Sequence, residues 1–413
     1  MKSLKRDFRS WLEIQKPKVL ASPQNAIARG KLLCSQVKPF LTEPSPDNIR
    51  WCGHVMANRQ QWANFFEVDD LSSALIFAMD NPVTPQDVSW PPVEERPPEI
   101  NHLGPFSLPG LPLTNYFTSF IVVAFVSSGD VNLSIHRAQV REDGSLVLRI
   151  VRRHLYELLE QAGGRMRAAL LAGVDPALLL ASAVSLPNPG GELGVAGALQ
   201  NMPVEIAEID GLRVPISFEI CITGEFTGEM APEGPFIDLT GTLDFVREQP
   251  VFRIERIFTQ PNPILPMILP SSPEHALLMG FPREAGILRA LSPLYQDSLR
   301  VRLTVGAVGW LHAVVSGTSR AFKEEIAHAV FASHPSCKRL TLVDADIDPD
   351  NPHEVEWALA TRFQAGRDLL IFPNERGSTL DPSSRDGITD RWVLDARIPL
   401  ASDPQQFVRL LKV

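Results

Sequence analysis

Apolar residues follow different spacings in different parts of the chain. Residues 71–79 place apolar side chains at helical intervals, whereas Phe120–Val126 form an unbroken apolar run. Between them, the span from Pro91 to Pro112 is so rich in proline that it is not expected to hold regular structure. The pattern therefore predicts an N-terminal region with helices, an extended connector and then a buried strand.

Strand-like runs dominate the middle of the chain. Residues 214–223 and 251–258 are rich in β-branched and aromatic side chains that alternate with polar ones, and one or two helical patterns lie between 151 and 182. Such alternation is typical of antiparallel strands with one covered face. Later segments alternate strand, helix and strand as in a βαβ unit, at residues 301–305, 320–331 and 339–343.

These patterns predict a mixed α/β (α+β) protein with three domains. Residues 1–110 are expected to form an N-terminal α/β domain with the proline-rich connector, and residues 111–300 a β-rich central domain. Residues 301–413 are expected to form a smaller α/β domain. Its last segment, residues 404–413, is predicted to be a contact helix for oligomerisation.

Composition narrows the class of protein. The 413 residues are 44% apolar and 21% charged, with a net charge of −9, which describes a soluble globular protein and argues against nucleic-acid binding. The four cysteines form no Cys-x-x-Cys pair, so neither a zinc site nor a disulfide framework is indicated and a cytoplasmic location is expected. No signal peptide or membrane helix is predicted, because charge interrupts the N-terminal apolar residues and Phe120–Val126 is too short to span a bilayer.

Two acids five residues apart are the first candidate for chemistry. Glu233 and Asp238 flank a Gly-Pro turn, and Pro232 and Pro235 should stiffen the loop that carries them. Two neighbouring carboxylates need a cation or a hydrogen-bond donor if both are to stay ionised. Taken alone, the motif is more typical of a proline-stiffened turn with two surface acids.

The positive charge is expected from a strand about a hundred residues upstream. Asn132 and His136 share one face of that strand, while Arg137 has the opposite orientation. His154 opens an amphipathic helical segment, and Asn132, His154 and Glu233 together would make a mixed nitrogen and oxygen site suited to Mn²⁺ or Mg²⁺. As single residues, Arg137 and His154 are more often structural, and His136 is assigned no role.

Five segments in one order resemble the UbiD-type decarboxylases, which use prenylated FMN. The resemblance covers roughly residues 110–400 and implies a split β-barrel that binds the flavin in the central domain. It implies a flavin prenyltransferase as supplier of the cofactor, and a homodimer or homohexamer. The segments are Asn132–Arg137, Glu233–Asp238, Asp344–Asp348, Glu356–Arg362 and Arg391–Ala396.

The resemblance also implies roles for individual residues. Arg137, Glu233 and Asp238 would form the catalytic group, and Mn²⁺ would bridge Asn132, His154 and Glu233 to the cofactor phosphate. K⁺ would be held by the backbone carbonyls of Leu133, Ala181, Ser182 and Val184. Contacts with the cofactor are implied for Asn132, Ser134, Ile135, Arg137, Arg153, His154, Ala181, Ser182, Ala183, Val184, Ser185, Glu233 and Arg391.

Some positions depart from the family pattern. The loop that cradles the flavin, residues 181–187, contains Ser182-Ala-Val-Ser185 where the family has Ser-Ser-Met-Pro. Arg153 stands where Gln is frequent, and Arg391 replaces a phosphate-binding Lys, a mild change because Arg binds phosphate with two parallel bonds. Cofactor binding is still predicted.

The reaction itself gives a reason for such a cofactor. Cleavage of a carbon–carboxylate bond leaves an electron pair on carbon that no side chain can hold, so an organic electron sink is required. Arg137 would orient the substrate carboxylate or keep Glu233 ionised, and Asp238 would protonate the carbon that CO₂ leaves.

The substrate is predicted from weaker features. Residues 277–284 and 376–382 resemble compact archaeal members linked to an alternative mevalonate route to isoprenoids, which would make the substrate trans-anhydromevalonate 5-phosphate and the product isopentenyl phosphate. Arg283 and His275 are candidates for binding its phosphate. A hydroxybenzoate-type aromatic or heteroaromatic acid is the alternative, with a flat pocket from Phe281, Trp310 and Leu311.

Two further functions stay open at this point. One is a cofactor-binding subunit without activity, and the other is a metal-dependent hydrolase built on Asn132, His154 and Glu233. Asp344, Asp346 and Asp348 are interpreted as acids at a strand end that face solvent. The glycines between 190 and 197 are interpreted as a plain loop and the start of a helix.

Overall fold

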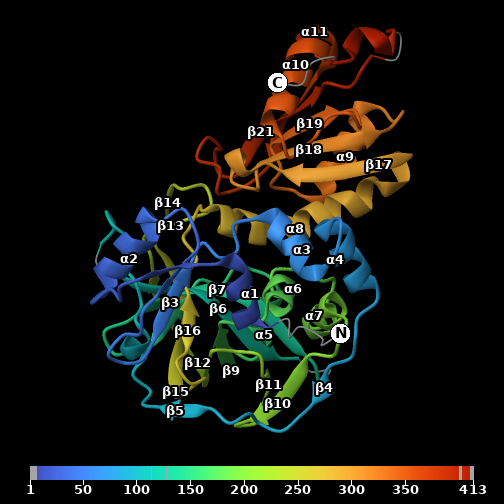
Figure 1. Cartoon of the computed structure of the whole chain (residues 1–413). Helices are drawn as coiled ribbons and strands as arrows, with labels where there is room; N and C mark the ends of the chain where they lie inside the picture. The colour runs from blue at the N-terminus through green and yellow to red at the C-terminus, as the bar shows by residue number, and fades with distance from the viewer. Residues whose placement is uncertain (1–6, 113, 127–128, 400–401, 410–413) are drawn as a thin grey trace. The chain divides into compact units, whose positions relative to one another are not determined.

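The computed structural model describes residues 7–112, 114–126, 129–399 and 402–409, which fall into two compact units (Figure 1). The first unit comprises residues 1–238 and 243–278, and the second comprises residues 239–242 and 279–413. The division between Leu278 and Met279 falls inside one helix, α8 (Pro273–Leu291). The three-domain division at residues 110 and 300 stays a prediction.

The first unit is built around a closed barrel of six antiparallel strands. Each strand pairs with the next, and β12 pairs with β15 to close the circle, as the green and yellow strands of Figure 1 show. The predicted mixed α/β fold with a β-barrel is confirmed. In barrel order the strands are β12 (Ile220–Glu233), β9 (Arg165–Ala172), β6 (Asn115–Phe125), β7 (Val131–Val140), β8 (Leu146–Leu148) and β15 (Arg247–Thr259).

Burial explains why these segments are strands. In β6, the side chains of Phe120, Ile121 and Val122 are fully buried, as the apolar run predicts. The sequence analysis did not predict β9, whose Arg-Met-Arg-Ala-Ala-Leu-Leu-Ala sequence has helical propensity. It pairs with β6 on one side and β12 on the other, so tertiary pairing overrides local preference there.

The chain before the barrel adds a small sheet and four helices to the first unit. Asp70 caps the predicted helix at 71–79 by accepting a hydrogen bond from the backbone N–H of Ser73. A four-stranded sheet has the order β1-β2-β3-β16. The elements are α1 (Phe8–Gln15), β1 (Lys18–Leu20), α2 (Ala26–Ser35), β2 (Phe40–Thr42), β3 (Arg50–Gly53), α3 (Arg59–Phe66), α4 (Leu71–Asp80) and β16 (Ile264–Pro266).

The proline-rich connector holds more regular structure than predicted. A short strand, β5 (Glu94–Arg96), pairs with the end of β15, and a 3₁₀ helix, η1 (Ile100–Leu103), buries both of its apolar ends. The expectation of no regular structure over 91–112 was therefore wrong. Prolines flank β5 but do not enter it, and an edge strand of three residues needs few backbone donors.

Three helices and a small sheet complete the first unit. The helices are α5 (His154–Gln161), α6 (Pro176–Ala181) and α7 (Glu192–Gln200), and both α5 and α7 pack against β7. The small sheet has the order β11-β10-β4, from β11 (Leu212–Pro215), β10 (Glu205–Ile209) and β4 (Gln86–Asp87).

The second unit contains a five-stranded sheet. Its strands β18 and β19 are parallel and joined by α9, so the second unit contains a βαβ unit. The predicted first strand at 301–305 overlaps β17, which pairs antiparallel with β18, so the strand that opens the unit is β18. Helices α10 (Pro352–Arg362) and α11 (Ala365–Asp368) follow. In order across the sheet, the strands are β17 (Asp297–Leu303), β18 (His312–Thr318), β19 (Arg339–Val343), β21 (Ile388–Asp395) and β20 (Leu369–Arg376), and α9 spans Lys323–Ser333.

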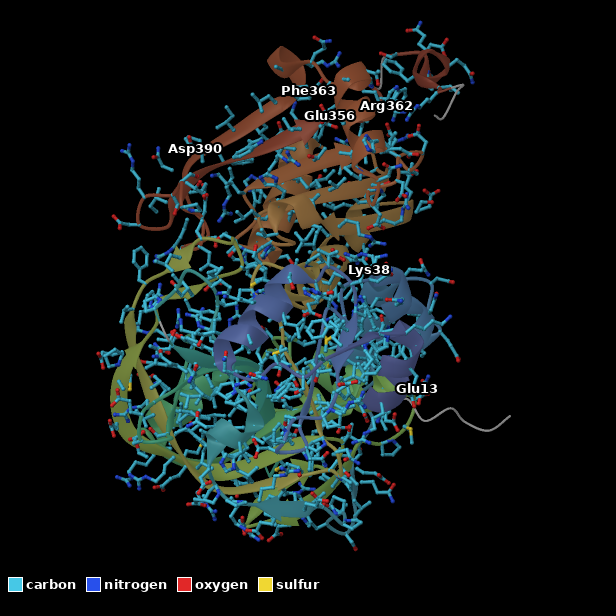
Figure 2. The ribbon with its side chains drawn as sticks, turned by 60° about the vertical axis from the view of Figure 1, so that its left-hand side comes forward. Glu13, Lys38, Glu356, Arg362, Phe363 and Asp390 are labelled. Carbon is cyan, nitrogen blue, oxygen red and sulfur yellow. The ribbon has the colours of Figure 1, made fainter. Side chains whose placement is uncertain are left out.

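The acids after β19 have a structural task. Arg362, on α10 (Figure 2), is buried and donates to Asp344 at 3.1 Å and to Asp346 at 2.6 Å. The structural interpretation of these acids is thus supported, although they neutralise a buried guanidinium in addition to meeting solvent.

The C-terminal segment differs from the predicted contact helix. Pro404–Phe407 form a single 3₁₀ helix, η4, and Val408 and Arg409 are not helical. Residues 410–413 lie outside the described residues. In the described part, Asp403 caps the short turn by accepting the N–H of Gln405, and the turn ends after four residues. Across the residues that the structure describes, no helix is both long and apolar enough to cross a bilayer.

Candidate active site

A buried ion pair joins two barrel strands. Arg137, on β7, donates through Nε to Oε1 of Glu233 at 2.9 Å and through Nη2 to Oε2 at 3.0 Å. The Glu233 side chain is 0% exposed and that of Arg137 is 12% exposed. Glu233 is the last residue of β12, so it belongs to a strand end and not to the predicted loop. Two parallel bonds fix the orientation of both groups.

Two further acids surround the same guanidinium. Arg137 Nη1 lies 3.4 Å from Oδ2 of Asp238, which follows β13 (Phe236–Ile237) and is 21% exposed. Arg137 Nη2 lies 3.1 Å from Oδ2 of Asp244, the buried last residue of β14 (Leu243–Asp244). The structure therefore brings Arg137, Glu233 and Asp238 together as predicted, and it adds Asp244, which the sequence analysis did not single out.

Electrostatic interactions keep Arg137 and Asp244 ionised. Burial opposes the charge of Arg137, but the bonds to Glu233 outweigh it and raise the pKa of the guanidinium. Burial likewise works against ionisation of Asp244, yet its bond to Arg247 and the charge of Arg137 lower its pKa overall. Arg137 and Asp244 are therefore held in their charged forms.

A tyrosine orients the Glu233 carboxylate. The Tyr116 hydroxyl lies 3.1 Å from Oε1 of Glu233 and 2.9 Å from Oε1 of Gln139, and that amide oxygen also accepts the N–H of Gly234 at 2.9 Å. Burial raises the pKa of Tyr116, and the charge of Glu233 adds to the effect, so the hydroxyl stays protonated and can donate. Tyr116 and Gln139 are cross-strand partners, a relation that local sequence does not reveal.

A chain of hydrogen-bonded polar side chains runs along the other face of β7. The Asn132 amide donates to Ser134 Oγ at 3.4 Å, and Ser134 Oγ lies 2.8 Å from Nε2 of His136. Nδ1 of His136 lies 2.8 Å from the carbonyl of Arg149 and donates to it, so Nε2 accepts from Ser134. Burial lowers the pKa of His136 to about 4, so the imidazole is neutral and supports Ser134.

The predicted flavin loop reaches the start of α5. His154 is the first residue of α5 and half-buried, and Arg153 Nη1 donates to Ser185 Oγ at 3.1 Å. Within the loop, the carbonyl of Ala181 accepts the N–H of Val184 at 3.0 Å. The other predicted cofactor contacts lie in regular structure. Ile135 pairs with Ile121 across the strands. The N–H of Ala183 donates to the carbonyl of Leu180, and the Ser182 hydroxyl donates to the carbonyl of Leu178.

A buried acid without a cation lies beside Asn132 and Leu133. Glu192 is the first residue of α7 and is 1% exposed, and Oε2 lies 3.5 Å from the N–H of Leu133. No lysine, arginine or histidine of the described chain forms an ion pair with it. Burial raises the pKa of Glu192 to about 8, and the charge of Asp130 contributes in the same direction. The sequence analysis missed this residue because it interpreted the glycine-rich segment as a plain loop.

The acid of the predicted metal set, Glu233, is already bound by a cation. Both carboxylate oxygens of Glu233 are bonded to Arg137. Among the residues with described positions, no group of three or more His, Cys, Asp or Glu side chains could hold a metal ion. A set of one Asn, one His and one Glu is not covered by this statement, because Asn is not among those residue types. Glu192 could supply the acid of such a set, because no described cation neutralises it.

Several residues predicted to bind the cofactor or the substrate contact other protein groups in the structure. Arg391, in the second unit, is buried, donates to the carbonyls of Pro335 and Arg376 and lies over the ring of Phe331. Burial lowers the pKa of His275 to about 4, and its Nδ1 accepts the N–H of Ser271. Of the proposed substrate contacts in the second unit, Phe281 is fully buried, Leu311 is partly buried, and Arg283 lies over the ring of Trp310.

Comparison with known proteins identifies the family. Residues 113–273 match the Rift-related domain of 3-octaprenyl-4-hydroxybenzoate carboxy-lyase, named UbiD, and residues 276–396 match its C-terminal domain. The chain belongs to the UbiD family. UbiD members are carboxy-lyases, and this chain is one of them.

Individual UbiD relatives agree with this assignment. Anhydromevalonate phosphate decarboxylase from Aeropyrum pernix is 38% identical over 365 residues, which are 84% of this chain and 82% of the relative. The structure of the UbiD-class enzyme HmfF from Pelotomaculum thermopropionicum in complex with FMN superposes with a TM-score of 0.90 at 30% identity, covering 98% of this chain and 97% of the other. An evolved dimeric form of HmfF in complex with prFMN gives a TM-score of 0.85 at 27% identity, covering 98% of this chain and 99% of the other.

Proposed function

We propose that this UbiD protein decarboxylates trans-anhydromevalonate 5-phosphate to isopentenyl phosphate with the help of prenylated FMN. The observation that carries the proposal is the ion pair between Arg137 and the fully buried Glu233, with Asp238 at its exposed edge. The substrate is inferred from the archaeal relatives, among them the Aeropyrum pernix enzyme, and the cofactor from the HmfF complexes. An aromatic or heteroaromatic acid is the alternative substrate, and a subunit without activity is the alternative function.

The described residues fit a flavin phosphate and a divalent metal. When bound, the prenylated flavin supplies the electron sink that cleavage of the carboxylate requires. Arg153 and Ser185 lie together at the start of α5, and helix N-termini favour phosphate groups. The buried Glu192 lies 3.5 Å from the backbone N–H of Leu133, the residue after Asn132, and no described cation pairs with it.

We further propose that Glu192 takes the metal-ligand role predicted for Glu233. Glu233 already has a cation, since Arg137 binds both of its oxygens, whereas Glu192 has none among the described residues. Mn²⁺ or Mg²⁺ would then be held by Asn132, His154 and Glu192. K⁺ at the carbonyls of Leu133, Ala181, Ser182 and Val184 stays a prediction, as do the prenyltransferase supplier, the homodimer or homohexamer and the cytoplasmic location.

Each residue of the Arg137 cluster has a task in this reaction. Arg137 attracts the substrate carboxylate and keeps Glu233 ionised, while Tyr116 holds the orientation of Glu233. The carbon–carboxylate bond breaks to release CO₂, and the carbon must then gain one proton. Asp238 is the acid of the cluster with access to solvent, so it delivers that proton and is recharged from water.

Turnover by the loaded enzyme tests the proposal. The protein would be co-expressed with a flavin prenyltransferase, supplied with Mn²⁺ and K⁺, and given trans-anhydromevalonate 5-phosphate. Release of CO₂ together with isopentenyl phosphate is the expected result. Turnover of aromatic acids alone would support the alternative substrate, and a flavin-loaded protein that decarboxylates neither would support the inactive subunit.

A further inference from the structure

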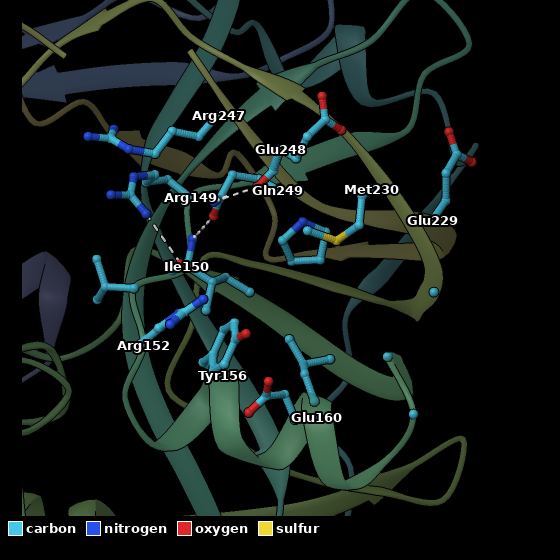
Figure 3. A pocket seen from close by; sticks show the side chains of 16 residues that line it. Arg149, Ile150, Arg152, Tyr156, Glu160, Glu229, Met230, Arg247, Glu248 and Gln249 are labelled. Carbon is cyan, nitrogen blue, oxygen red and sulfur yellow. Dashed lines mark hydrogen bonds between the residues drawn. The ribbon is translucent and has the colours of Figure 1, made fainter. Parts of the chain in front are cut away.

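A cavity opens directly beside the Arg137 cluster. It has a volume of about 760 Å³ and lies between α5, the middle of β12 and the first residues of β15 (Figure 3). The local cause is a break in pairing: β12 leaves register with β15 between Phe226 and Met230. Such a bulge bends one strand away from its partner and leaves space between them.

Two arginines of this cavity share one carboxylate. Arg247 Nη1 donates to Oδ1 of Asp244 at 2.5 Å, and Nε of Arg149 lies 3.8 Å from Oδ2. Figure 3 shows the two guanidinium groups side by side on one wall, with Glu229 on the opposite wall. Burial lowers the pKa of Arg149, and the charge of Arg247 contributes to this. Arg149 and Arg247 therefore lie beside the same carboxylate of Asp244, which also contacts Arg137.

The rest of the wall carries one more arginine and three acids, Glu160, Glu229 and Glu248. Arg152 adds a third guanidinium and lies over the ring of Tyr156. Glu229 is matched by Arg141, at 3.0 Å, outside the cavity. Several N–H groups of Arg149 and Arg247 have no protein acceptor among the described residues, so they are available to an anion.

Asp244 links these two arginines to Arg137. Oδ2 of Asp244 is 3.1 Å from Arg137 and 3.8 Å from Arg149, so the two guanidinium groups stand on either side of one carboxylate. A ligand with two anionic ends could place its carboxylate at Arg137 and its other anion at Arg149 and Arg247. The predicted phosphate contacts serve less well, because His275 is neutral and Arg283 belongs to the second unit and lies over Trp310.

We propose that Arg149 and Arg247 form the subsite for the phosphate monoester of the substrate. This inference rests on the proposed function, since it names the residues that select a phosphorylated acid over an aromatic one. A guanidinium binds phosphate through two parallel, charge-assisted bonds, and two of them beside one cavity suit a dianion. The separation between Arg137 and these two arginines would then set the length of the substrate that fits.

Kinetics and product binding of the loaded enzyme test the subsite. Arg149→Gln and Arg247→Gln are compared with Arg253→Gln, which removes the same charge from an exposed position of β15. For each subsite variant we expect KM for the phosphorylated acid and Kd for isopentenyl phosphate, measured by titration calorimetry, to rise about tenfold or more with kcat nearly unchanged. Arg253→Gln should match the wild type. Arg247→Lys keeps the charge beside Asp244 and should give an intermediate rise.

Two results would overturn the subsite. KM and Kd equal to those of Arg253→Gln would show that the arginines do not touch the phosphate. Loss of flavin from Arg149→Gln or Arg247→Gln would assign the arginines to the cofactor phosphate. Failure of the proposed function is a separate result: a wild-type enzyme that does not turn over the phosphorylated acid, yet binds isopentenyl phosphate through Arg149 and Arg247, would refute the substrate and retain the subsite.

Discussion

Glu233 and Glu192 are both buried carboxylates of the barrel unit, and their surroundings are opposite. Glu233 is bonded twice to Arg137 and once to Tyr116, whereas Glu192 meets one backbone N–H and the charge of Asp130. A buried carboxylate with a cation is stable as it stands, while one without a cation is satisfied by protonation or by a metal ion. This difference supports the proposal that Glu233 takes part in the reaction and that Glu192 binds the metal ion.

The largest effect is expected from the paired acid. Glu233→Gln removes the charge that Arg137 holds but keeps the shape of the side chain, so the protein should fold and retain its cofactor. Turnover should fall about a thousandfold or more, measured as CO₂ release. Glu225→Gln, a partly exposed acid of the same strand, is the matched control and should keep wild-type activity. A Glu233→Gln enzyme with wild-type turnover would contradict the assigned role.

The unpaired acid should control metal retention. Glu192→Gln is expected to weaken Mn²⁺ binding about a hundredfold, and to lower flavin content with it, because the metal is proposed to bridge protein and cofactor phosphate. The metal-free variant should melt at a temperature equal to or above that of the metal-free wild type, since the raised pKa of Glu192 shows that burying this acid costs stability at neutral pH, a cost that an amide avoids. Glu208→Gln, on the exposed side of β10, is the control. Unchanged metal content would show that Glu192 is not a ligand.

The orientation of Glu233 should have a smaller effect. Tyr116→Phe removes the hydroxyl that contacts Glu233, and kcat/KM is expected to fall about tenfold while the flavin stays bound. Tyr295→Phe is a useful control, because the buried Tyr295 hydroxyl has no hydrogen-bond partner among the residues that the structure describes, so its removal should leave stability unchanged or improved. Equal activity of Tyr116→Phe and wild type would mean that Arg137 alone orients the carboxylate.

The smallest effect concerns acid stability. The pKa of Asp244 is lowered in the folded protein, so its contribution to stability is present above the pKa of an unfolded aspartate and is lost as pH falls through the folded pKa. Asp244→Asn should therefore lower the melting temperature at neutral pH by the equivalent of about 1 kcal/mol, and the difference from wild type should shrink on acidification below pH ~4. A difference that stays constant with pH would argue against the ion pairs of Asp244.

The sequence was most informative where one motif carries the chemistry. Arg137, Glu233 and Asp238 could be proposed because each belongs to a short segment that resembles the family, and the structure brings them together. Asp244 and Tyr116 could not be found in this way. Asp244 reaches Arg137 through the β13–β14 hairpin, and Tyr116 meets Gln139 only through the register of β6 and β7.

Tertiary context also explains the other misses. β9 has a helical composition and becomes a strand because two neighbours pair with it. Glu192 is 60 residues from Asn132, in a glycine-rich stretch that offers no local signal, and only the packing of α7 on β7 brings it close. Burial without a partner, the property that marks Glu192, is visible only in three dimensions.

The most direct test of this account is the metal and flavin content of Glu233→Gln and Glu192→Gln, each co-expressed with a flavin prenyltransferase and weighed by native mass spectrometry. We expect Glu233→Gln to retain Mn²⁺ and prenylated FMN without turnover, and Glu192→Gln to lose both. The reverse pattern, with metal lost from Glu233→Gln and kept by Glu192→Gln, would contradict the division of tasks between the two acids.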